Sequence, residues 1–111
     1  MDIAETFIDN IEKDNINTIV KNPKIYTQIE DRNTLSEVLK YMLIKYNNNL
    51  NYLIKHDKIK DEVLKNNDLV LLSKKILIIN ENLNKLSGNL NKNLSIDRLL
   101  IEMWRCNNEN S

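Results

Sequence analysis

The chain has 111 residues, of which 41% are hydrophobic and 29% are charged, a balance typical of a folded globular domain and not of a disordered segment. Sixteen basic and sixteen acidic side chains leave no net charge, which argues against a protein that binds nucleic acid through phosphate contacts alone. One Gly and one Pro are too few for the turns of a β-sheet protein, so residues 1–111 are expected to form an all-α, single-domain bundle of about five to six helices.

Apolar residues at three- and four-residue spacing predict the first helices. One helix is expected from Asp2 to Lys13, and its apolar face consists of Ile3, Phe7, Ile8 and Ile11. Ile16, Ile19 and Val20 predict a short helix over residues 16–21. It is expected to end there because the residue before Pro23 is steered away from helical backbone angles. Ile25, Tyr26 and Ile29 then predict another turn or two, or the start of the following helix.

A long central helix follows, with Asp31 or Asn33 as the residue that caps its N-terminus. Its apolar face is expected to be Leu35, Val38, Leu39, Met42, Leu43 and Tyr46. The asparagines at 47–49 weaken a helix, because their side chains compete for backbone hydrogen bonds. The apolar phase nevertheless continues through Leu50, Leu53 and Ile54, which allows the helix to run on to His56.

A short helix, a loop and a second long helix are predicted next. The short helix covers Ile59–Lys65, with Ile59, Val63 and Leu64 facing inward. Asp68 is placed to cap the long helix that follows the loop at 66–68. The apolar face of that long helix is expected to be Leu69, Leu72, Ile76, Ile79, Leu83, Leu86 and Leu90.

A tight corner ends this helix and begins the last one. Gly88 and Asn89 are the residue types that enter the left-handed conformation at a helix C-terminus most readily, and Asn91 is placed to cap the next N-terminus. Asp97 in the first turns complements the helix dipole, and the polar tail from Asn107 onward is expected to fray. The apolar stripe of the last helix is Leu94, Ile96, Leu99, Leu100, Met103 and Trp104. So short a connection requires the two helices to pack antiparallel or sharply crossed.

Motifs for catalysis or cofactor binding are missing from the sequence. A single His and a single Cys cannot form a zinc site, and one Gly cannot build a phosphate-binding loop. His56 beside Asp57 has the makings of a general base, but a solvent-facing His stabilised by a helix C-terminus is the simpler interpretation. Cys106 is interpreted as a spare thiol in a reducing cytosol. We therefore expect a cytoplasmic protein that is not an enzyme and needs no cofactor or metal.

Charged and aromatic side chains leave alternatives open. A weak basic strip is possible on the last helices, although a solubilising face is the simpler interpretation; it comprises Lys74, Lys75, Lys85, Lys92, Arg98 and Arg105. Carboxylates such as Asp2, Glu5 and Asp9 are interleaved with lysines and are interpreted as a solvated face. Trp104 is either an interface anchor or a residue that closes the end of the core.

The corner also carries a family resemblance. The pattern Leu86-x-x-Asn89-x-Asn91-x-x-Leu94-x-Ile96-Asp97-x-Leu99-Leu100 resembles the C-terminal signature of bacterial clamp-loader subunits, and most of all that of the delta-prime subunit of DNA polymerase III. The similarity covers residues 33–104. The family often has an Arg–Asp pair where this chain has Asn47–Asn48, which puts any role of that pair in doubt.

The resemblance implies a collar domain, which is a helical bundle that packs in a ring of five subunits while the assembly loads a sliding clamp onto DNA. The chain would then be a fragment of a longer subunit, without direct ATP binding and with little or no DNA contact. Residues expected at the contact, because the core does not need their helix faces, are Tyr41, Tyr52, Lys85, Arg98, Glu102 and Trp104. The alternative is a freestanding small helical adaptor or regulator that binds one protein partner.

Overall fold

Helices make up nearly all of the chain that the computed structural model describes, which is residues 3–13, 23–86, 88 and 91–109. In chain order the elements are α1 (Ile3–Lys13), α3 (Pro23–Gln28), α4 (Arg32–His56), the 3₁₀ turn η1 (Glu62–Leu64), α5 (Leu69–Lys85) and α6 (Lys92–Glu109). No strand occurs in these residues, so the prediction of an all-α single-domain bundle is confirmed. The helix predicted over residues 16–21 lies outside the described residues.

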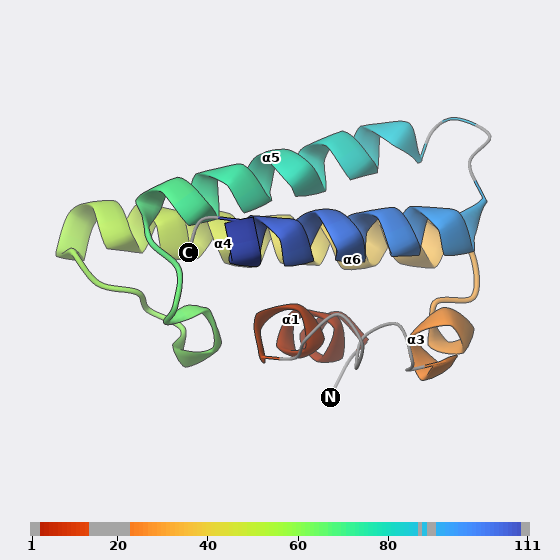
Figure 1. Ribbon diagram of the computed structural model, residues 1–111, viewed down its shortest axis with the longest axis horizontal. Coiled ribbons are helices and arrows are strands. Elements are labelled where there is room, and N and C mark those ends of the chain that lie inside the picture. The colour runs from red at the N-terminus through yellow and green to blue at the C-terminus, as the bar shows by residue number, and fades with distance from the viewer. Residues whose placement is uncertain (1–2, 14–22, 87, 89–90, 110–111) are drawn as a thin grey trace.

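The three long helices run along the longest dimension of the molecule, and each is antiparallel to the one before it (Figure 1). α5 packs against both α4 and α6. α1 contacts α4, α6, η1 and α3, and Figure 1 shows α1 and α3 nearly end-on, so they cross the long helices. The largest fully buried side chains come from α1, α3, the bend after α3, α4, the turn η1 and α5; they include Phe7, Ile8, Ile25, Ile29, Leu35, Leu39, Met42, Tyr46, Leu64 and Leu72.

A side-chain cap begins α4 and a backbone hydrogen bond ends it. The Asp31 carboxylate accepts a hydrogen bond from the Thr34 backbone N–H at 2.8 Å, and this bond holds the pKa of Asp31 below its usual value. Asp31 is therefore the cap and Asn33 is not. At the other end Asp57 adopts the left-handed conformation with φ 57°, and its N–H donates to the Leu53 carbonyl at 2.8 Å.

The asparagine run does not interrupt α4. The side-chain amides of Asn47 and Asn49 donate to the carbonyls of Leu43 and Lys45, four residues earlier, each at 2.9 Å. These groups thus bond along the helix instead of competing with it. The prediction that the helix continues to His56 is confirmed.

Several predicted faces and boundaries are wrong. Leu69, Leu94 and Ile54 are exposed although the sequence phase placed them inward. The helix predicted over Ile59–Lys65 is only the three-residue turn η1. The tail expected to fray is helical to Glu109, because the Asn107 amide donates to the Ile11 carbonyl at 3.2 Å and so ties α6 to α1.

Among the described helices, none combines the length and the apolar character that a membrane span requires.

Candidate functional site

The corner between α5 and α6 carries the family resemblance, and the cap at Asn91 is formed as predicted. The Asn91 Oδ1 accepts from the backbone N–H of Asn93 at 2.8 Å and of Leu94 at 3.4 Å. Asp68 caps α5 in the same way through the Leu71 N–H at 2.8 Å. These side chains satisfy backbone donors that have no partner within their own helices.

Gly88 does not act as predicted. Its backbone is not in the left-handed region, and α5 ends at Lys85 followed by Leu86 in a right-handed conformation. The Gly88 N–H donates to the Lys85 carbonyl at 3.1 Å, and the Gly88 carbonyl accepts from the Arg32 Nη1 at 2.5 Å. The corner is therefore held by contact with the start of α4. Asn89 lies outside the described residues.

Asp97 takes part in tertiary contacts beyond the dipole role expected of it. The Tyr26 hydroxyl on α3 donates to the Asp97 carboxylate. Burial raises the pKa of Tyr26 to about 12, and the hydrogen bond and charge of Asp97 act in the same direction. The Lys92 ammonium donates to the Tyr26 carbonyl at 2.8 Å. The first turns of α6 are thus fixed to α3 from two sides.

The six candidate interface residues come from different helices. Tyr41 and Tyr52 lie on α4; the Tyr41 hydroxyl donates to Glu5, and the Tyr52 ring lies 4.2 Å from the His56 ring between centroids. On α6 the structure brings Arg98 and Glu102 together, with 3.4 Å between Arg98 Nε and Glu102 Oε1.

The remaining candidates lie on α5 and α6. Glu102 also accepts from the Asn82 amide at 3.1 Å, which links α6 to α5. Lys85 is exposed at the end of α5. Trp104 is half-buried, so its side chain neither closes the core completely nor stands free in solvent.

The two residues considered for catalysis differ in exposure. His56 is exposed in the last turn of α4, and Cys106 is buried in α6. Within the described ranges, no three His, Cys, Asp or Glu side chains are grouped so as to hold a metal ion.

An ion-paired triad lies at the surface between α1 and α4. The Lys45 Nζ is 2.8 Å from Glu5 Oε2 and 3.0 Å from Asp61 Oδ2. Burial lowers the pKa of Lys45, but the hydrogen bonds and charges of Glu5 and Asp61 outweigh burial, so the pKa is raised. Asp61 in turn has a lowered pKa, because its bonds to Lys45 and to the Val63 N–H outweigh its own burial. The triad attaches the segment before η1 to the bundle.

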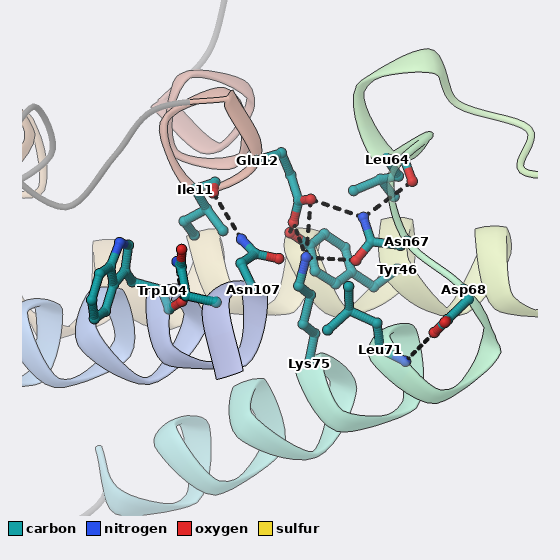
Figure 2. A network of polar contacts seen from close by, with 11 residues as sticks. Ile11, Glu12, Tyr46, Leu64, Asn67, Asp68, Leu71, Lys75, Trp104 and Asn107 are labelled. Atoms are coloured by element: carbon teal, nitrogen blue, oxygen red, sulfur yellow. Dashed lines mark hydrogen bonds and ion pairs between the residues drawn. The ribbon is translucent and has the colours of Figure 1, made fainter. Parts of the chain in front are cut away.

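Sequence reasoning missed a buried polar network between α1, α4 and α5 (Figure 2). The Lys75 side chain is fully buried, and its Nζ lies 3.0 and 2.8 Å from the two carboxylate oxygens of Glu12, whose side chain is only 2% exposed. A charge is costly to bury unless a partner and further hydrogen bonds compensate it. A basic strip and a solubilising face both require Lys75 to lie on the surface, so both interpretations are wrong for this residue.

Two more side chains complete this network. The Tyr46 hydroxyl donates to Glu12 Oε2 at 2.7 Å, and the Asn67 amide donates to Glu12 Oε1 at 2.8 Å. Lys75 also donates to Asn67 Oδ1 at 2.5 Å. Burial, followed by the charge and hydrogen bond of Glu12, raises the pKa of Tyr46 well above its ordinary value. The signal in the sequence was the helical phase of Lys75, which lies three residues after Leu72 and four before Ile79.

No family model, no curated protein and no solved structure matches this chain.

Proposed function

We propose that this chain is a non-catalytic oligomerisation domain, the collar domain of a DNA polymerase III clamp-loader subunit of the delta-prime type. Its partners are the other subunits of a five-membered ring, and it supports sliding-clamp loading in DNA replication in the cytoplasm. The single observation that carries the proposal is the Asn91-capped corner between α5 and α6, because it coincides with the most specific part of the family resemblance.

Two features of the bundle agree with a positional role. The corner is attached to α3 and α4 through the contacts of Asp97, Lys92 and Arg32, so the α5–α6 pair is held in a fixed relation to the rest of the domain. Large apolar side chains also remain exposed on the long helices, which suits a domain flanked by other helical domains. They are Tyr41, Ile44, Ile54, Leu69, Val70, Leu77, Leu94 and Ile101.

The proposal is tested by co-expressing the chain with the other clamp-loader subunits of the same organism and purifying the assembly through a tag on one of them. We expect the wild-type chain to co-purify, and the Trp104→Ala and Arg98→Glu variants to be depleted while retaining their helical circular dichroism. If the wild-type chain does not enter the assembly, the collar role is refuted. The freestanding adaptor then becomes the better interpretation, because the exposed apolar side chains suit a single protein partner equally well.

A further inference from the structure

The outer face of α6 carries a regular ridge of apolar and basic side chains. Leu94, Arg98, Ile101 and Arg105 are all exposed and follow one another at steps of four, three and four residues. At 3.6 residues per turn these four side chains fall within an arc of about 60° on the helix surface. Leu94 is 60% exposed and Ile101 is 40% exposed, so considerable apolar surface faces solvent along this ridge.

The ridge is not required by the bundle itself. The opposite face of α6 already fills the core with Ile96, Leu99, Leu100 and Met103, each at most 1% exposed. Leu94 and Ile101 are seven positions apart, which is a spacing at which residues of one helix meet a second helix packed along it. The two arginines repeat at the same interval and alternate with the apolar pair along the helix.

The outer face of α5 provides an informative comparison. Val70 and Leu77 repeat with the same seven-residue spacing and are each 59% exposed, but Lys74 and Glu81 between and beside them have opposite charges. The α5 face therefore has no preferred sign of charge. The ridge on α6 has one, because the charged residues on it are both arginines.

We propose that the ridge formed by Leu94, Arg98, Ile101 and Arg105 docks an acidic amphipathic helix of a partner protein. Apolar residues of that helix, seven apart, would cover Leu94 and Ile101, and its flanking carboxylates would pair with the two guanidinium groups. Arg98 already pairs with Glu102 at 3.4 Å, but an ion pair at a solvent-exposed position is weak and can rearrange at little cost. The inference holds whether or not the chain belongs to a clamp loader.

A helix fits the ridge better than a nucleic acid does. Phosphate contacts need basic groups only, whereas this ridge alternates them with two large aliphatic side chains that a phosphate backbone leaves exposed. The chain as a whole also carries no net charge.

The test uses the full chain and a fluorescein-labelled, hydrocarbon-stapled helical peptide of about eighteen residues, with leucines seven apart and glutamates at the flanking positions. Fluorescence anisotropy at low salt is expected to give saturable binding with Kd on the order of 10–100 μM, weakening as NaCl is raised. The double variant Arg98→Glu/Arg105→Glu is expected to weaken binding by about tenfold or more.

A matched control separates the ridge from general electrostatics. Lys40→Glu/Lys55→Glu changes the net charge equally at exposed positions on α4, and Lys40 also has an exposed acidic neighbour, Glu37, at 3.6 Å. Its affinity for the peptide is expected to stay within about twofold of wild type. The same peptide with lysines in place of glutamates is expected not to bind.

Four results would overturn the proposal. They are no binding up to about 1 mM peptide, equal binding of the lysine peptide, an equal loss in the α4 control, and saturable binding of a duplex oligonucleotide to the ridge. Sedimentation equilibrium tests whether a second copy of this chain occupies the ridge instead. A dimer that the Leu94→Ser variant abolishes would assign the ridge to self-association and would also overturn the proposal. None of these measurements involves a clamp-loader subunit, so failure here is distinguishable from failure of the assembly test.

Discussion

Replacing Lys75 with Met is expected to destabilise this protein more than the same change at any exposed lysine among the described residues. The variant leaves the Glu12 carboxylate buried without the ammonium that now lies 2.8 and 3.0 Å from its oxygens. The attraction between two unit charges at that separation is about 6 kcal/mol at an effective dielectric constant near 20. Breaking a buried pair by removing one partner costs about 3–5 kcal/mol, which is a large part of the roughly 5–15 kcal/mol that stabilises a domain of this size.

The assay is urea unfolding followed by far-ultraviolet circular dichroism, in which the Lys75→Met midpoint is expected to fall by roughly 2 M. Lys74→Met is the matched control, because Lys74 is the adjacent residue but is exposed, and its midpoint should barely change. In the double variant Glu12→Gln/Lys75→Met no charge is left buried, so at least about half of the lost stability should return. If Lys75→Met unfolded like Lys74→Met, the ion pair would contribute nothing and the reasoning would be refuted.

Three further predictions concern the caps and the shifted pKa values. Asn91→Ala is expected to cost about 1 kcal/mol in thermal unfolding through loss of the α6 cap, whereas Asn93→Ala, at an exposed position two residues further on, should be neutral. Asp61 has a folded-state pKa below its ordinary 3.8, so the stability that it contributes is present above pH 3.8 and is lost as the pH falls below that value. The Asp61→Asn variant should therefore lose less stability in an acid titration than wild type does. An acid profile identical to that of wild type would contradict this prediction. Tyr26 has a raised pKa of about 12, so the stability that it contributes is present below pH 10 and is lost between pH 10 and 12. The urea midpoint of wild type should fall over this range, and that of Tyr26→Phe should fall less. An equally steep fall in the variant would contradict this prediction.

The helix starts could be predicted because their chemistry is local. Asp31, Asp68 and Asn91 each accept a hydrogen bond from a backbone N–H two or three residues further along, so the order of residues contains all the information needed. The three long helices were predictable for a similar reason, since each has an apolar face that repeats over several turns.

The segment between α4 and α5 was harder to predict because distant groups determine it. The Asp61 N–H donates to Asn49 Oδ1 at 2.8 Å, and the Asp61 carboxylate pairs with Lys45. These contacts hold the chain in a bent path, so only the residues of η1 form a helical turn where a longer helix was expected. The prediction of a frayed tail was wrong for the same reason. The end of α6 is secured by a hydrogen bond between Asn107 and Ile11, which are 96 positions apart in the sequence.

Lys74 and Lys75 show what sequence reasoning leaves undecided at the candidate site. Both are lysines in the same turn of α5, yet one is exposed and the other is completely buried. The helical phase of Lys75 is that of the inner face, but a charge could be predicted there only by knowing that Glu12 of α1 pairs with it. That meeting depends on tertiary structure, as does the pairing of Tyr26 with Asp97.

The molecule thus departs from a simple inside-apolar, outside-polar pattern in two opposite ways, and the two departures have different consequences. The charges of Glu12 and Lys75 inside the bundle make sense as a device that fixes how α1 sits on α4 and α5, because any displaced arrangement leaves a charge buried without its partner. The exposed pair Leu94 and Ile101 contributes little to that arrangement, since the inner face of α6 already fills the core. Substitutions at the interior pair should therefore change stability, and substitutions on the α6 ridge should change association while leaving stability nearly unaltered. If the ridge variants proved as unstable as Lys75→Met, Leu94 and Ile101 would belong to the fold and the ridge would not be a docking surface.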